Sequence, residues 1–237
     1  MIELKLYPSS DSHPQHRNID VTSNILKVRV SFKWLPLVND TVVKTIRQWT
    51  TTDSSERPYW IFLSMTLWHM HNEHEANYRL YQSKLSELAP HLGQLANVSQ
   101  VIWLHQYTSL DFYGGIRASN TAIFAEKIDS YNKITRRIMK SLHSGIRVWD
   151  SSNALVEEYI RSCTIIKRDE KEKKIYPIGP HHAYAYFSCL DCVHTGYAAL
   201  SQATQLLFND ICNRQMEEAL LKKTSDRKFK FISEVNG

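Results

Sequence analysis

The sequence predicts an α/β domain in which a parallel sheet is covered by helices on both faces. Four short segments rich in β-branched and aromatic residues are bounded by polar or turn residues, as strands are: residues 26–35, 59–65, 98–107 and 145–150. The second and third contain continuous apolar runs, which are typical of strands buried on both faces. Segments with helical spacing of apolar side chains alternate with these strands, and that alternation favours parallel pairing.

The helical segments follow from apolar residues that recur at intervals of three or four. Residues 121–142 give the clearest pattern, with Ile128, Tyr131, Ile134 and Ile138 on one side. The same reasoning predicts helices over residues 40–49, 73–95, 153–160 and 197–212. Ligands of such sheets bind beyond the carboxyl ends of the strands, so we expect the functional site in the loops that follow them.

The composition is that of an ordinary globular protein. Of the 237 residues, 43% are apolar and 22% are charged, which is enough for one sizeable domain. We expect that domain over residues 1–215, with an insertion at residues 163–190 where the strand–helix alternation breaks, and a basic tail over residues 216–237.

The net charge of +5 owes much to that tail. Because no aromatic interleaving or nucleic-acid motif accompanies the cations, we do not expect nucleic acid as a partner. No apolar run reaches the roughly 18 residues of a transmembrane helix, and the first eight residues lack a signal-peptide core. The four cysteines are Cys163, Cys189, Cys192 and Cys212, too few for a disulfide scaffold, and their pairing is left open.

The first candidate for chemistry is Asp191-Cys192-Val193-His194, just before the last predicted helix. A hydrolase or acyltransferase that uses a serine needs a histidine base whose second ring nitrogen is held by a carboxylate. An aspartate three residues before a histidine can present both side chains to one site. The alternative is an unrelated aspartate and histidine in a loop, because this spacing is common by chance.

A second candidate is the histidine-rich segment that opens at Trp68. It holds His69, His71 and His74, and it also carries Glu73 and Glu75. This spacing could supply metal ligands, but we favour a solvated polar turn after a buried strand, which could still border a substrate site, and we expect no bound metal. Two N-glycosylation sequons begin at Asn39 and Asn97.

Several stretches of the sequence resemble the lumenal domain of the animal sialic acid O-acetyltransferases. They are KVRVSFKWLPLVNDT from Lys27, YQSKLSELAPHLGQLANVSQVIWLHQ from Tyr81, AEKIDSYNK from Ala125 and NDICN from Asn209. The resemblance covers roughly residues 13–160 and 191–213, and the sequon at Asn39 falls where the family also has one.

The resemblance implies a Golgi enzyme with an SGNH-hydrolase-like domain of three layers. In that family acetyl passes from acetyl-CoA through a serine to a hydroxyl of CMP-activated sialic acid. His194 would be the base and Asp191 would orient it. Trp68, and Gln106 at the end of the third predicted strand, are the candidate substrate-binding residues, and no bound cofactor is expected.

The sequence departs from the family in three ways. The Gly-Asp-Ser block with the nucleophile, which follows the first strand of the fold, has no counterpart in these 237 residues. The resemblance therefore implies a sheet without its first strand and doubtful activity for this chain alone. The glycine that the family has after its third strand is missing here, where the run is Ser64-Met65-Thr66-Leu67-Trp68, and the family's C-terminal membrane helices have no counterpart.

Two rival functions remain open at the level of sequence. One is a catalytically dead remnant that binds a carbohydrate or a partner protein. The other is an SGNH-type esterase that releases acyl groups from glycans.

Overall fold

The computed structural model describes residues 18–71, 77–110, 123–141, 145–167, 184–191 and 193–235. Its centre is a parallel sheet of three strands, β3 (Trp60–Leu63), β4 (Gln100–Leu104) and β5 (Arg147–Trp149), in the order β3-β4-β5. The predicted parallel pairing of the strands within residues 59–65 and 98–107 is confirmed, with Ile61 opposite Val101. The α/β class is therefore as expected.

The strand expected at residues 26–35 lies outside the parallel sheet. It is β2 (Val28–Phe32), which pairs antiparallel with β1 (Ile19–Ser23) in a separate hairpin. The physical reason lies in the sequence of β2, where valine and phenylalanine alternate with Arg29 and Ser31. Such alternation suits an antiparallel ribbon with one polar face, whereas a strand of a covered parallel sheet is apolar on both faces. The expectation that this segment follows the same parallel pattern is wrong.

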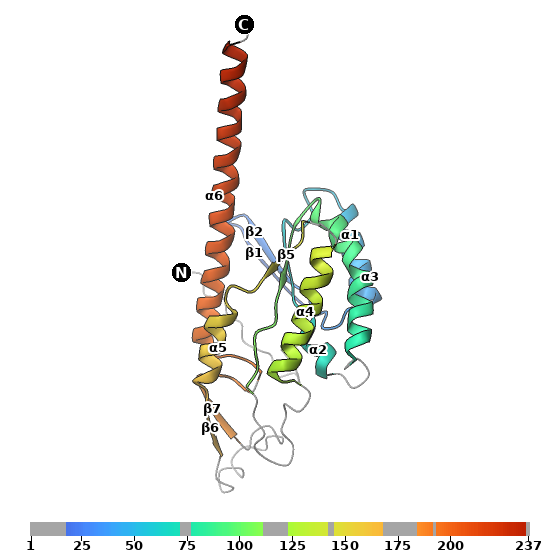
Figure 1. Ribbon diagram of the computed structural model, residues 1–237, viewed down its shortest axis with the longest axis vertical. Coiled ribbons are helices and arrows are strands. Elements are labelled where there is room, and N and C mark those ends of the chain that lie inside the picture. Colours follow the sequence, from blue (N-terminus) through green and yellow to red (C-terminus); the bar gives the residue numbers. More distant parts are fainter. Residues whose placement is uncertain are drawn as a thin grey trace.

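Three long helices form one side of the molecule (Figure 1): α1 (Asp40–Thr51), α3 (Tyr78–Ala96) and α4 (Ala125–Ser141). Polar caps fix where two of them begin, because Asn39 accepts the N–H of Val42 and Asn77 accepts the N–H groups of Arg79 and Leu80. A short helix, α2 (Thr66–His71), follows β3 directly.

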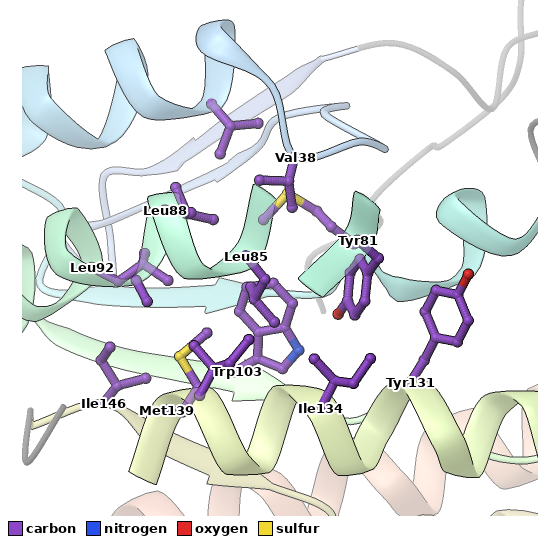
Figure 2. Packing of buried hydrophobic residues seen from close by; sticks show 14 of the residues in the cluster. Val38, Tyr81, Leu85, Leu88, Leu92, Trp103, Tyr131, Ile134, Met139 and Ile146 are labelled. Carbon is purple, nitrogen blue, oxygen red and sulfur yellow. The ribbon is translucent and has the colours of Figure 1, made fainter. Parts of the chain in front are cut away.

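The main core lies between this helical layer and the sheet. Figure 2 shows Trp103 of β4 between Leu85 and Leu88 of α3 and Ile134 and Met139 of α4. The indole of Trp103 is fully buried, as are the side chains of Leu85 and Leu88. Full burial of a large side chain stabilises the fold by about 1.5–3 kcal/mol, so this layer holds β4 in place.

Two further helices, α5 (Asn153–Arg161) and α6 (Tyr197–Val235), pack against each other. Val148 of β5 packs against the main core, and Arg147, its neighbour on the opposite face, forms an ion pair with Asp210 of α6 at 3.0 Å. The helix expected at residues 197–212 continues to Val235. Figure 1 shows that α6 projects well beyond the rest of the molecule.

The expected insertion begins and ends in a second hairpin. Strand β6 (Thr164–Lys167) pairs antiparallel with β7 (Tyr184–Phe187), and residues 168–183 between them lie outside the described part of the chain. Among the helices that are described, none has the length and hydropathy needed to cross a membrane.

Candidate active site

Asp191 and His194 lie in a tight loop between β7 and α6. The loop is closed by an isolated bridge between Cys189 and Thr195, and the N–H of Leu190 donates to the carbonyl of His194 at 2.8 Å. The loop begins at Ser188, whose φ of 72° lies in the left-handed region. These contacts give the segment a defined backbone on which the two side chains are held.

The carboxylate of Asp191 makes three hydrogen bonds within this loop. Its Oδ1 accepts the N–H groups of Val193 at 2.7 Å and of His194 at 2.8 Å. Its Oδ2 accepts a hydrogen bond from Nδ1 of His194 at 2.7 Å. The side-chain contact expected from the sequence is therefore present, because the turn places residues 191 and 194 on the same side. Their catalytic role stays a prediction.

The electrostatics of the pair favour a charged carboxylate and a basic imidazole. Burial alone would raise the pKa of Asp191, but the hydrogen bonds from His194 and from two backbone N–H groups outweigh it and lower the pKa below 3.8. The hydrogen bond to Asp191 raises the pKa of His194 above 6.5, against the opposing effect of burial. Since 61% of the His194 side chain is exposed, its Nε2 is available to exchange a proton with a bound molecule.

Tyr107 connects this loop to the carboxyl end of β4. It lies three residues beyond the strand, and its phenol lies close to the backbone of Thr195 and to the charge of Asp191, both of which affect the pKa of Tyr107. Its ring packs against a small cluster formed by Val156, Ile160 and Cys189. His194 therefore lies beyond the end of the central strand, where α/β proteins place their ligands. Burial raises the pKa of the Tyr107 phenol.

A disulfide between Cys163 and Cys189 holds the other end of the loop. It joins Cys163, two residues after the end of α5, to Cys189, the second residue of the loop. The cross-link closes the segment expected as an insertion at its base, so the loop is attached covalently to α5. Cys212 on α6 is a free, exposed thiol. The sequence alone gave no basis for choosing this pairing among the four cysteines.

Gln106, a predicted substrate-binding residue, is next to Tyr107. Asn132 of α4 binds both its backbone groups, accepting its N–H at 3.2 Å and donating to its carbonyl at 2.7 Å. Asn153 of α5 donates to the same carbonyl at 3.2 Å, and the Gln106 amide donates to the carbonyl of Tyr107. These contacts fix the loop after β4, and substrate binding by Gln106 stays a prediction.

Trp68, the other predicted substrate-binding residue, lies on α2. Its ring meets that of Trp34, which follows β2, edge to face at a centroid distance of 5.7 Å. The contact anchors the hairpin to α2, and substrate binding by Trp68 stays a prediction. Ser64, at the carboxyl end of the neighbouring strand β3, is exposed.

The histidine-rich segment is only partly described. His69 is fully buried, and its Nε2 accepts the backbone N–H of Val38 at 2.9 Å. That bond links α2 to the start of α1, which is a structural role. Glu73, His74 and Glu75 lie outside the described residues, as does the side chain of His71. Within the described ranges, no group of three histidine, cysteine or acidic side chains could hold a metal ion.

Both sequon asparagines are exposed, and each lies directly next to one end of a helix. Asn39 caps α1 and borders a hollow of about 410 Å³ that also includes Lys84 and Glu87 of α3. Asn97 follows α3, and the Ser99 hydroxyl of its sequon donates to the carbonyl of Pro58. The hollow does not contain Asp191 or His194, so it marks a different part of the surface. Glycosylation at either position stays a prediction.

His105, at the carboxyl edge of the sheet, was not identified as a candidate site residue from the sequence. His105 follows β4, and its Nδ1 lies 3.4 Å from Arg136 of α4 and 3.8 Å from Asp150, which follows β5. Arg136 and Asp150 form an ion pair with each other. Burial and the Arg136 charge, against the effect of Asp150, lower the pKa of His105 to about 4, so it is neutral at physiological pH. The sequence signal was a histidine directly after a buried strand.

Comparison with known proteins leaves the chain without an assigned family. No protein-family model matches the sequence, and no solved structure matches it significantly.

Proposed function

We propose that this chain is an acyltransferase domain in which His194, oriented by Asp191, is the general base. The observation that carries the proposal is the 2.7 Å hydrogen bond between His194 Nδ1 and Asp191 Oδ2, on an exposed loop beyond the end of β4. This arrangement commits Nδ1 to the carboxylate and directs proton exchange to Nε2. Because two backbone N–H groups hold the Asp191 carboxylate in place, the carboxylate in turn keeps the His194 imidazole in one orientation.

The chemistry has two steps when the nucleophile is a serine. His194 takes the serine proton while the serine oxygen attacks the acetyl carbonyl, and the carbon–sulfur bond of acetyl-CoA breaks with return of the proton to sulfur. His194 then takes the proton of an acceptor hydroxyl, whose oxygen attacks the acetyl-serine, and the serine leaves with that proton. In both steps Asp191 stabilises the imidazolium that forms.

The finer assignment rests on the resemblance to the sialic acid O-acetyltransferases. It adds an SGNH-like architecture, acetyl-CoA as donor, a sialic acid hydroxyl as acceptor and a Golgi setting. A parallel sheet with the Asp–His loop just before its last helix is compatible with that architecture. A disulfide supports an oxidising compartment, because such bonds persist in secretory and lumenal proteins. The acceptor is proposed from the resemblance alone.

The test is acetyl transfer from acetyl-CoA to CMP-sialic acid. The 237-residue chain is assayed alone and joined to a family-type Gly-Asp-Ser strand, turn and helix. We expect turnover in the joined form, lowered about 10³-fold or more by His194→Ala. His91→Ala is the matched control, because His91 bridges to Arg47 on the far helices and should leave the rate unchanged.

Three outcomes separate the alternatives. Acetate release without transfer, lost with His194→Ala, would favour the esterase. Full activity in His194→Ala would contradict the proposal, since the reaction would then proceed without His194 as the general base. Inactivity of a folded joined form that still binds CMP-sialic acid would favour the binding remnant.

A further inference from the structure

Tyr107 is anchored between the end of β4 and the loop that holds His194. The residue before it, Gln106, is fixed through both of its backbone groups by Asn132 of α4. The ring of Tyr107 packs against the small apolar cluster that contains Cys189, and the disulfide of Cys189 joins that cluster to the end of α5. The aromatic ring is therefore held in place by the fold itself, before any substrate binds.

The phenol of Tyr107 meets the Asp191–His194 loop from the side of the central strand. It lies close to the backbone of Thr195, the residue that follows His194, and close enough to Asp191 for the charge of that carboxylate to affect it. Thr195 is buried and pairs with Cys189 across the base of the loop, whereas the His194 side chain is exposed. A substrate group that reaches His194 therefore also comes near the Tyr107 hydroxyl.

The hydroxyl of Tyr107 stays protonated over the physiological pH range. Burial is the main cause that raises the pKa of this phenol above 10, and the charge of Asp191 adds to it, against the opposing effect of the Thr195 backbone. A protonated phenol carries one O–H donor. Within the described part of the chain this O–H has no acceptor, whereas the hydroxyl of Tyr81 lies 2.8 Å from that of Thr135. Tyr107 thus has a donor that the fold does not use.

We propose that the Tyr107 hydroxyl donates a hydrogen bond to the acyl carbonyl oxygen as that oxygen becomes an oxyanion. The inference rests on the proposed acyl transfer by His194. When the attacking oxygen bonds to the acyl carbon, an electron pair of the C=O bond moves onto the carbonyl oxygen, and His194 holds the proton of the attacking group. A donor that is already fixed in place stabilises this charge without reorganisation.

The same contact serves the collapse of the intermediate. The C=O bond re-forms, the leaving sulfur or serine oxygen takes the proton from His194, and the Tyr107 proton stays on the phenol. Tyr107 is therefore a catalytic residue that stabilises charge, while His194 is the residue that transfers the proton.

The test is Tyr107→Phe in the joined form, assayed for acetyl transfer to CMP-sialic acid. The change removes the hydroxyl and keeps the ring in its cluster. We expect kcat to fall about 10²-fold with the KM for acetyl-CoA changed by less than about 2-fold, because the contact forms in the transition state. A 3-fluorotyrosine at position 107 keeps the O–H donor and should restore most of the lost rate. Tyr159→Phe is the matched control, because the Tyr159 hydroxyl accepts a hydrogen bond from Gln202 between α5 and α6 and should not affect kcat.

Histidine NMR separates hydrogen-bond donation from support of the loop. In Tyr107→Phe we expect the pKa of His194 to stay above 6.5, as in the wild-type chain, and thermal unfolding checks that the variant is folded. A slower variant in which the pKa of His194 moves toward 6.5 would show that Tyr107 acts through the loop, and would overturn the proposal.

The kinetic outcomes distinguish this proposal from the proposed function. An unchanged kcat in Tyr107→Phe, with transfer lost in His194→Ala, would defeat the donor role and leave acyl transfer by His194 standing. Full activity in His194→Ala, or no turnover in a folded joined form, would defeat both.

Discussion

His194 is the residue on which the proposed chemistry depends. Its Nδ1 is held by Asp191, and the carboxylate is in turn held by two backbone N–H groups of the same loop. The base, its orienting group and the donors that fix that group all come from four consecutive residues. Such a local unit forms wherever the loop forms.

The titration of His194 should report this contact directly. We expect its pKa above 6.5 in the wild-type chain and closer to that value in Asp191→Asn, because the hydrogen bond to Asp191 is the main cause of the increase. A base must be neutral, so the acyl-transfer rate should rise with pH through this raised pKa. Histidine NMR, with the signal assigned by its loss in His194→Gln, provides the measurement. A pKa that does not respond to Asp191→Asn would show that the two side chains are not coupled in solution.

At this scale the sequence predicts local contacts and misses distant ones. Asp191 and His194 were found because they are three residues apart and act within one turn. His105 was missed because its partners, Arg136 and Asp150, come from a helix and from the end of another strand. The disulfide between Cys163 and Cys189 was left open for the same reason, since the pairing depends on how residues 26 apart are brought together.

The loop between β7 and α6 is the element that holds the site. Its two ends approach so closely that Gly196 has no room for a side chain: a Cβ there would lie 2.7 Å from the carbonyl oxygen of Ser188. A glycine is therefore required for the approach, and the position of His194 depends on it.

Gly196→Ala should displace the loop. We expect a loss of about 1–3 kcal/mol in the free energy of unfolding, typical of overpacked positions, and a clear fall in acyl transfer. Gly145→Ala is the matched control, because its Cβ would meet Ala96 at an ordinary 3.6 Å. Denaturant unfolding of both variants checks the prediction, and equal effects of the two changes would contradict this account of the loop.

At the scale of elements, the sequence predicted the helices well and one strand poorly. The helices follow from a repeating apolar face, which is a local property, so α1, α4 and α5 lie within a few residues of their expected ends. β2 was expected in the parallel series, although its alternating pattern already favoured an antiparallel partner. Its partner β1 contains the short alternation Ile19-Asp20-Val21, which is too brief to be recognised without the pairing.

The whole molecule is a small parallel sheet packed on one face against α1, α3 and α4, while α6 meets β5 on the other face through the Arg147–Asp210 ion pair and extends well beyond it. Along α6 the described burial ends at Ile211, and residues 212–217 are exposed. The sequence placed the end of this helix near the same point because the apolar repeat ends there. A helix can continue beyond its packed face wherever the residues have adequate helical propensity, so its length could not be inferred from packing.

Truncation should separate the packed and projecting parts of α6. A chain that ends after Glu217 should keep its melting temperature to within about 2 °C, because no described buried residue is removed. A chain that ends after Asn209 loses Ile211 and the Arg147–Asp210 ion pair, and should melt several degrees lower, as expected for a loss of about 2 kcal/mol. Calorimetry of both chains provides the comparison, and a large effect of the first truncation would show that the projecting part also packs.

The central claim is that His194 transfers protons in acyl transfer rather than merely supporting the loop. Chemical rescue tests this claim most directly: His194→Gly, in the form joined to a Gly-Asp-Ser segment, is assayed for acetyl transfer with increasing free imidazole. The account predicts a loss of about 10³-fold or more, with partial and saturable recovery as imidazole fills the vacated position beside Asp191. A folded His194→Gly variant that retains the full rate without imidazole would contradict it.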